Sequence, residues 1–225
     1  MEFITQLQTA FEANANADNQ QQMQVYMRNL FHFHGIKAPL RKQLTKELVV
    51  AHKSFLQENI RDVVNKLYKL PQREYHYTAM ELYQKFLNKK YNLEDGRFFT
   101  RMITTHSWWD SVDFLAKHVF GKYLLQFPEQ KRKMLDYYSA NDNMWLNRSA
   151  ILYQLSYKNE TDEVELFKQC TLHKDSEEFF IQKAIGWALR EYGKVQPKAV
   201  LDFVKSVKLK ELSEREAIRR LVRLG

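Results

Sequence analysis

The chain contains 225 residues, and its 35 Lys and Arg against 27 Asp and Glu give a formal net charge of +8. A chain of this length can bury the core of one domain, so we expect residues 1–225 to form a single domain. The positive charge favours a polyanionic partner such as nucleic acid. One cysteine excludes an internal disulfide, and neither a signal-peptide pattern nor a membrane-spanning stretch is present, so we expect a cytoplasmic protein.

The predicted elements are helices throughout. The chain has only 6 Gly and 4 Pro, and residues of high helix propensity dominate it. Apolar residues recur with a helical period, without the alternation that marks strands. The first three stripes are Phe3, Leu7, Ala10 and Phe11, then Leu40, Leu44 and Leu48, then Tyr75, Ala79, Leu82 and Phe86. This pattern predicts an all-α protein of about 11–13 helices.

A degenerate internal repeat begins in the third stripe. Small or branched core residues with a similar setting occur at Ala79, Val112, Ala150, Ala184 and Ala217, spaced by 33, 38, 34 and 33 residues. Each lies in the second helix of a predicted helix pair. This repeat length is typical of an α-α superhelix, a HEAT-like or ARM-like solenoid, and we expect a curved body with a basic concave face lined by the second helices.

Tryptophans and carboxylates cluster at the start of one predicted helix. Ser107, followed three residues later by Asp110, resembles a capping box and predicts a helix from Trp108. Trp109 and Asp113 are four residues apart, so they share a helix face. They are either candidate site residues or an edge-of-core ring and a structural ion pair.

An arginine interrupts the next apolar helix. Arg148 lies among Leu146, Ala150 and Ile151, and a guanidinium in such a helix must find an anion because burying it alone is costly. The anion is a carboxylate of a neighbouring helix, with Asp113 as one candidate, or a phosphate.

A further predicted helix begins after Asp175, with Glu178 completing a capping box. Trp187 lies on its apolar stripe, with Lys183 one turn before it and Arg190 three residues after it. Trp187 is either a core residue or part of a site.

The last predicted helix begins at Ser213, which forms a capping box with Glu216. It carries four arginines, Arg215, Arg219, Arg220 and Arg223. Such a run is a solvated face or a surface that follows a nucleic-acid backbone.

The sequence lacks several chemical signatures. It has no nucleotide-binding glycine loop and no nucleophile elbow, and its seven histidines never pair with Cys or acids at metal-ligand spacing. We therefore expect no cofactor and no metal, and a site that acts through electrostatics and positioning.

Several long stretches of the chain resemble the AlkD family of bacterial DNA alkylation-repair glycosylases. They are residues 26–29, 31–41, 107–113 (Ser-Trp-Trp-Asp-Ser-Val-Asp), 142–152 (containing Trp-Leu-Asn-Arg), 179–192 (containing Gly-Trp-Ala-Leu-Arg) and 213–217. The resemblance covers essentially the whole chain. It implies a HEAT-like solenoid that holds duplex DNA and releases purines alkylated at N3 or N7.

The resemblance also implies roles for individual residues. Trp109, Asp113 and Trp187 match the catalytic cleft of the family. The resemblance also predicts which residues contact the DNA backbone, because their positions match family residues that bind the backbone or lie near it. These residues are Arg148, Arg190, Lys183, Tyr26 and Lys37. Two positions depart from the family pattern: Lys37-Ala38 stands where relatives have Gln-Thr, and Ser156 where they have lysine. These departures concern the grip on DNA rather than the chemistry.

The predicted activity is hydrolysis of the N-glycosidic bond of cationic alkylated purines in duplex DNA. We expect a monofunctional glycosylase of base excision repair, acting as a monomer. Asp113 would stabilise the oxocarbenium-like sugar, and the tryptophans would pack against it. Two alternatives stay open. A DNA-binding relative without glycosylase activity would bind DNA and release no base. A protein-binding helical scaffold would hold Asp113 in a buried salt bridge and lack a basic concave face.

Overall fold

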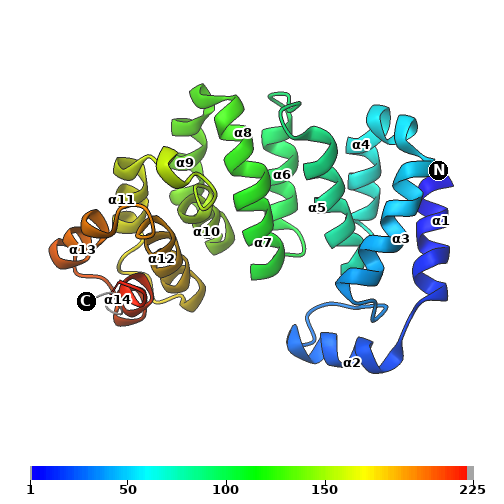
Figure 1. Ribbon diagram of the computed structural model, residues 1–225, viewed down its shortest axis with the longest axis horizontal. Coiled ribbons are helices and arrows are strands. Elements are labelled where there is room, and N and C mark those ends of the chain that lie inside the picture. Colours follow the sequence, from blue (N-terminus) through cyan, green and yellow to red (C-terminus); the bar gives the residue numbers. More distant parts are fainter. Residues whose placement is uncertain (1, 222–225) are drawn as a thin grey trace. The chain divides into compact units, whose positions relative to one another are not determined.

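Helices make up all the regular structure of residues 2–221, the part of the chain that the computed structural model describes (Figure 1). Apart from helices, these residues contain one isolated bridge between His32 and Gln72. Thirteen helices result when Trp109–Gln126 is counted as one continuous helix, which confirms the all-α prediction and its helix number. Within residues 2–221, no helix is both long and apolar enough to cross a bilayer.

Contacts divide the helices into two compact units, Met1–Lys90 and Tyr91–Gly225. The single-domain prediction therefore stays a prediction. The first unit contains α1 (Glu2–Ala13), α2 (Ala17–Tyr26), α3 (Ala38–Ala51), α4 (Lys53–Leu67) and α5 (Arg73–Leu87). Here α1 packs on α3, and both α3 and α4 pack on α5.

Three of the four residues of the predicted N-terminal apolar stripe are buried, whereas Ala10 is only partly buried. Phe3, Leu7 and Phe11 are completely buried, which fixes the inner face of α1. The ring of Phe11 stacks on Tyr75 of α5, with 5.3 Å between the ring centroids. Tyr75 and Ala79 of the predicted third stripe are also buried.

The predicted stripe of α3 is wrong by one residue. Leu40 is 37% exposed, and the buried row is instead Arg41, Thr45 and Val49. The Arg41 guanidinium donates to both carboxylate oxygens of Glu81 on α5, at 2.8 and 2.9 Å. Because the Glu81 carboxylate pairs with the buried Arg41 guanidinium, the row that contains Arg41 can face α5, and the predicted leucines lie outside the buried row.

The turn before α3 depends on a buried carboxylate. Glu74 of α5 accepts hydrogen bonds from the backbone N–H groups of His34, Gly35 and Ile36, at 2.9 to 3.1 Å. Gly35 has a φ of +85°, and a methyl group there would overlap the Asn16 carbonyl oxygen. The turn thus requires glycine and delivers the chain to Lys37, the N-cap residue of α3.

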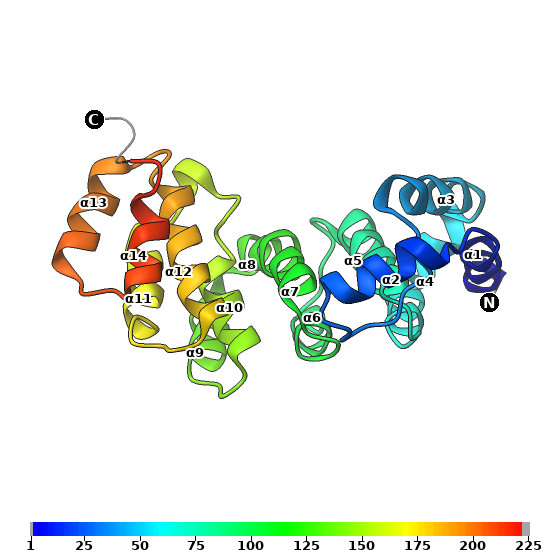
Figure 2. The same cartoon turned by 90° about the horizontal axis from the view of Figure 1, so that it is seen from below.

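The second unit begins with α6 (Asp95–Thr104) and a long helix made of α7 (Trp109–Leu115), a π-helical segment (Ala116–Phe120) and α8 (Gly121–Gln126). Its other helices are α9 (Lys131–Ser139), α10 (Met144–Leu152), α11 (Glu163–Leu172), α12 (Phe179–Tyr192), α13 (Pro197–Ser206) and α14 (Glu211–Ile218), with 3-10 turns at Pro128–Gln130 and Lys158–Glu160. Helix α10 packs on both α7 and α12. Helices α12 and α14 lie side by side in both views (Figures 1 and 2).

The repeat positions occupy equivalent places in the helix pairs. Ala79, Val112, Ala150, Ala184 and Ala217 are all completely buried. They lie in α5, α7, α10, α12 and α14, and the preceding helices α4, α6, α9, α11 and α13 pack on these respectively. The predicted pairing is therefore confirmed, while the curvature and the basic concave face stay predictions.

All three predicted capping boxes are wrong, because the serine or acid involved has a different partner or position. Helix α7 begins at Trp109, and the Ser107 hydroxyl donates to the Ile103 carbonyl at 2.6 Å. Helix α12 begins at Phe179 rather than after Asp175, and its N-cap residue Glu178 makes no capping bond.

The third predicted capping box, at Ser213, is also wrong. Helix α14 begins earlier, at Glu211, and the Ser213 hydroxyl donates across to the Gln182 carbonyl of α12 at 3.1 Å. Contacts with α12 thus take the place of a local cap. The fourth predicted arginine of this helix, Arg223, lies outside the described residues.

Replacing Gly35 with alanine will destabilise the protein by about 1–3 kcal/mol, because the residue must keep a positive φ and its methyl group meets the Asn16 backbone. Urea unfolding followed by circular dichroism measures the loss. Gly193→Ala is the control, since Gly193 has an ordinary φ of −60° and its added methyl group would require its neighbours to shift by only a few tenths of an ångström. Equal stability of the two variants would contradict this account of the turn.

Candidate functional site

An ion pair between α7 and α10 lies at the centre of the candidate site. The Arg148 Nε donates to Asp113 Oδ1 at 2.7 Å, and its Nη2 donates to Oδ2 at 2.9 Å. The Arg148 side chain is 5% exposed and that of Asp113 is 14% exposed. Of the anions open to Arg148 in the sequence, the structure therefore selects Asp113. The Asp113 side chain is therefore not completely enclosed.

Arg148 also binds a third helix. Its Nη1 donates to the backbone carbonyl of Phe180, in the first turn of α12, and the guanidinium lies 6.0 Å from the Phe180 ring centroid. Arg148 thereby connects α7, α10 and α12 through one side chain. This geometry orients Asp113 from two sides, because a bidentate pair fixes both the position and the plane of the carboxylate.

Burial raises the pKa of the Asp113 carboxyl above its ordinary value, while the hydrogen bonds and the positive charge of Arg148 act against this rise. The neighbouring Asp110 contributes a smaller rise. Arg148 is therefore the group that keeps Asp113 available as a carboxylate.

Three aromatic rings, including the Phe180 ring next to Arg148, pack against one another. Trp108 and Trp145 each lie 5.1 Å from the Phe180 ring, and the two indoles lie 5.7 Å apart. Trp145 is buried and Trp108 is partly buried. Trp108 thus packs against two aromatic rings, and it precedes helix α7 rather than opening it as the sequence predicts.

The two predicted site tryptophans are both half-buried. Trp109 is the first residue of α7 and precedes Asp113 by one helical turn. Trp187 lies on α12, two turns after Phe180, and packs partly against the core. Both tryptophans thus lie on helices that Arg148 contacts, and both residues are partly exposed.

Two of the predicted backbone-contact cations share one carboxylate. Lys183 Nζ lies 2.8 Å from Glu216 Oε1, and Arg190 binds Glu216 Oε2. Hydrogen bonding from Lys183 and Arg190 lowers the pKa of Glu216, against the effect of burial. Sequence reasoning placed Glu216 in a cap instead. Its spacing of 33 residues from Lys183, one repeat length, is the signal that links the two.

Two other predicted contacts belong to the unit Met1–Lys90. Tyr26 is the last residue of α2 and is 70% exposed. Lys37 is an exposed N-cap residue, held in place through the Glu74-bound turn. Helix α2 buries none of its residues.

Ser156, where relatives have lysine, follows α10 and is partly buried. Its Oγ is enclosed and has no hydrogen-bond partner among the described residues. A hydroxyl in this position cannot extend to a DNA backbone as a lysine would.

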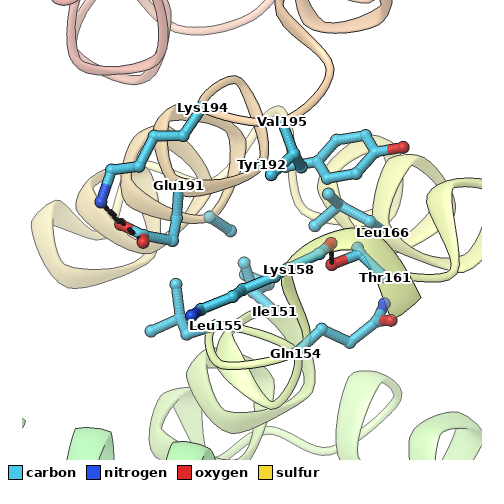
Figure 3. A pocket seen from close by; sticks show the side chains of 11 residues that line it. Ile151, Gln154, Leu155, Lys158, Thr161, Leu166, Glu191, Tyr192, Lys194 and Val195 are labelled. Atoms are coloured by element: carbon cyan, nitrogen blue, oxygen red, sulfur yellow. Dashed lines mark hydrogen bonds and ion pairs between the residues drawn. The ribbon is translucent and has the colours of Figure 1, made fainter.

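A cavity of about 300 Å³ lies apart from the predicted site residues (Figure 3). Its lining comes from the ends of α10 and α12, the start of α11 and the turn between α10 and α11. Glu191 pairs with Lys194 at its rim, and the Gln154 amide pairs with the backbone of Asp162. Since these polar groups satisfy one another, we assign no function to this cavity.

Within residues 2–221, no group of three or more His, Cys, Asp or Glu side chains is arranged to hold a metal ion. The independence from metals and cofactors that the sequence suggests stays a prediction.

Comparison with known proteins places this all-helical chain in a class of repair proteins. Residues 7–221 match the family described as DNA alkylation repair enzyme, so the chain belongs to the DNA alkylation repair enzyme family. A solved structure described as a predicted DNA alkylation repair enzyme from Enterococcus faecalis is 32% identical, with a TM-score of 0.85. The match covers 93% of this chain and 97% of that one. No curated protein sequence matches.

Replacing Arg148 with methionine will destabilise the protein by about 3–5 kcal/mol, because it leaves the Asp113 carboxylate buried without its partner. Urea unfolding measures this change. The double variant Asp113→Asn/Arg148→Met will lose less stability than the sum of the single variants, since the two residues form one unit. Additive losses would show that the pair does not act as a unit.

Proposed function

We propose that this protein is a monofunctional DNA glycosylase that releases purines alkylated at N3 or N7 from duplex DNA, as a step of base excision repair. The observation that carries the proposal is the Asp113 carboxylate, fixed by Arg148 one turn from Trp109 and still partly open to solvent. Membership of the DNA alkylation repair enzyme family supports DNA as the substrate, as does the net charge of +8.

The substrate itself explains why so few groups suffice. A purine alkylated at N3 or N7 is cationic, so it can leave without protonation by a general acid. Positive charge then develops on the deoxyribose. A preorganised carboxylate stabilises this charge and can orient the attacking water. Asp113 would do both, since its oxygens keep acceptor capacity beyond the two bonds from Arg148.

The tryptophans would stabilise the same cation. The face of an indole ring is electronegative, and a cation packed against it gains about 0.5–2 kcal/mol. Trp109 and Trp187 come from two helices that both contact Arg148, and both are half-buried. No lysine motif suggests strand cleavage, so the product would be an abasic site.

We infer that the lesion is handled at the backbone, without a base-binding pocket. Enzymes that flip a base enclose it between aromatic side chains. The cavity of Figure 3 has a single aromatic lining residue, Tyr192, whose hydroxyl is bonded to Glu163. It is therefore not such a pocket.

The role of Arg148 changes in the light of its contacts. The resemblance predicts a phosphate contact, and that stays a prediction. Three of its nitrogens already donate to Asp113 and to the Phe180 carbonyl. We therefore propose that Arg148 acts mainly by positioning Asp113 and keeping it ionised. Phosphate contacts would come from more exposed cations such as Lys183 and Lys37.

The buried pair also favours a second candidate. Both a scaffold and an inactive DNA-binding relative could hold Asp113 in a structural salt bridge. Family membership speaks against the scaffold, so the inactive DNA-binding protein is the alternative that an activity assay must exclude.

Release of free base from duplex DNA containing 7-methylguanine tests the proposal. The native protein will release base, and Asp113→Asn will reduce the single-turnover rate about 100-fold, because the amide cannot stabilise the sugar cation. Asp136→Asn, the same change at a 56% exposed carboxylate of α9, is the control and will retain the native rate.

Each other outcome has a definite meaning. DNA binding without release of 7-methylguanine or 3-methyladenine would establish the inactive relative. Base release that is equal in native protein and Asp113→Asn would keep the glycosylase but move the catalytic role away from Asp113. Circular dichroism must show that both variants are folded.

The activity will fall as the pH falls through the pKa of Asp113, because only the carboxylate stabilises the cation. Burial raises this pKa, so the decline will begin above the ordinary range of an aspartic acid. Arg148→Lys removes the bidentate bonds and will move the decline to higher pH. Single-turnover rates, corrected for spontaneous base loss, measure both profiles, and profiles that coincide would contradict the role of Arg148.

A further inference from the structure

Glu216 of α14 lies between two cations of α12. Its Oε1 accepts from Lys183 Nζ at 2.8 Å, its Oε2 accepts from Arg190, and its backbone carbonyl accepts from Arg190 Nη1 at 3.2 Å. The Glu216 side chain is 10% exposed, whereas that of Lys183 is 37% exposed and that of Arg190 is 22% exposed. The carboxylate is therefore enclosed, and its two partners extend toward solvent.

The arrangement places this carboxylate beside a predicted site tryptophan. Lys183, Trp187 and Arg190 follow one another at helical spacing, so they share one face of α12. Gly186 adjoins Trp187, and a methyl group at Gly186 would overlap the Glu216 side chain. Both the cations and the indole thus lie around the point where α14 approaches α12.

A second hydrogen bond between α14 and α12 fixes the position of α14 along α12. The Ser213 hydroxyl, one turn before Glu216, donates to the Gln182 carbonyl of α12. Ser213 is completely buried. The position of Glu216 is consequently fixed by helix packing as well as by its ion pairs.

We propose that Glu216 is a positioning residue, which fixes Lys183 and Arg190 beside Trp187 and offsets one of their two positive charges. This inference rests on the proposed function, because it concerns how the two cations meet a DNA phosphate. The consequence is that the protein binds undamaged DNA more weakly than it would without the Glu216 carboxylate. A phosphate that approaches Lys183 meets a cluster with a net charge of one, and it must share the ammonium group with a carboxylate.

Such restraint would serve a repair enzyme that must leave undamaged sites. Non-specific binding to duplex DNA comes almost entirely from phosphate contacts and counterion release. A buried carboxylate next to two contact cations lowers this binding while it keeps both cations ordered.

Equilibrium binding of an undamaged duplex, measured over a range of salt concentrations, tests the proposal. Glu216→Gln keeps the size of the side chain and removes its charge. It will bind undamaged DNA about three- to tenfold more tightly at low salt, and its salt dependence will steepen by about 0.9 for one additional phosphate contact. Glu214→Gln makes the same change in net charge at an exposed position of α14, and it will show neither effect.

Glu216→Asp separates position from charge. The shorter side chain keeps the carboxylate but withdraws it from its partners. This variant will keep the native salt dependence and release 7-methylguanine several-fold more slowly at saturating protein. Thermal unfolding followed by circular dichroism identifies any variant that does not fold, and Glu216→Asp then carries the test if Glu216→Gln is lost.

Three outcomes would overturn the inference. One is a folded Glu216→Gln that binds undamaged DNA no more tightly than the native protein. Another is equal tightening in Glu214→Gln, which would assign the effect to net charge. The third is native rates of base release in Glu216→Asp. If the native protein binds no duplex DNA at low salt, the proposed function fails as well, and the inference falls with it.

Discussion

The buried guanidinium of Arg148 is the constraint on which the second unit depends. A charge enclosed to this degree is tolerated only when it is paired with an anion and its donors find acceptors. Asp113 and the Phe180 carbonyl supply these acceptors from two different helices. The requirement to satisfy Arg148 therefore sets how α7 and α12 stand against α10. It also leaves a carboxylate oriented at the edge of the core.

Other buried polar groups also fix the segments around them. In the first unit, Arg41 is buried against Glu81 on α5, and Glu74 binds three backbone N–H groups of the turn before α3. In each case a polar group inside the fold fixes a segment that carries a predicted DNA contact. The buried ionic groups thus orient the surface residues around them more than they add stability.

Much of this could be predicted from the sequence, because helical periodicity and repeats are local signals. The five repeat positions are all buried, and the apolar helix around Arg148 indicated that its guanidinium needs an anion. The spacing of 38 between Val112 and Ala150 was anomalous in the sequence. In the structure, this repeat contains the π-helical segment Ala116–Phe120, which widens one turn of the helix without ending it.

The errors in α3 and α14 share one cause, which is that tertiary partners displace local preferences. Ser213 and Glu216 have the spacing of a capping box, yet both bind α12 instead. The leucine stripe of α3 yields to a row with Arg41 because Glu81 lies opposite it. A single sequence gives no measure of such partners, since they arise from residues 30 to 40 positions away.

The close approach of α14 to Gly186 has a consequence for how this surface can change. Glu216 reaches its two partners only because nothing protrudes from α12 at that point. Any larger residue at Gly186 would wedge the helices apart and release a lysine and an arginine together. An uncharged substitution at Gly186 would then change which charges lie close together on this surface.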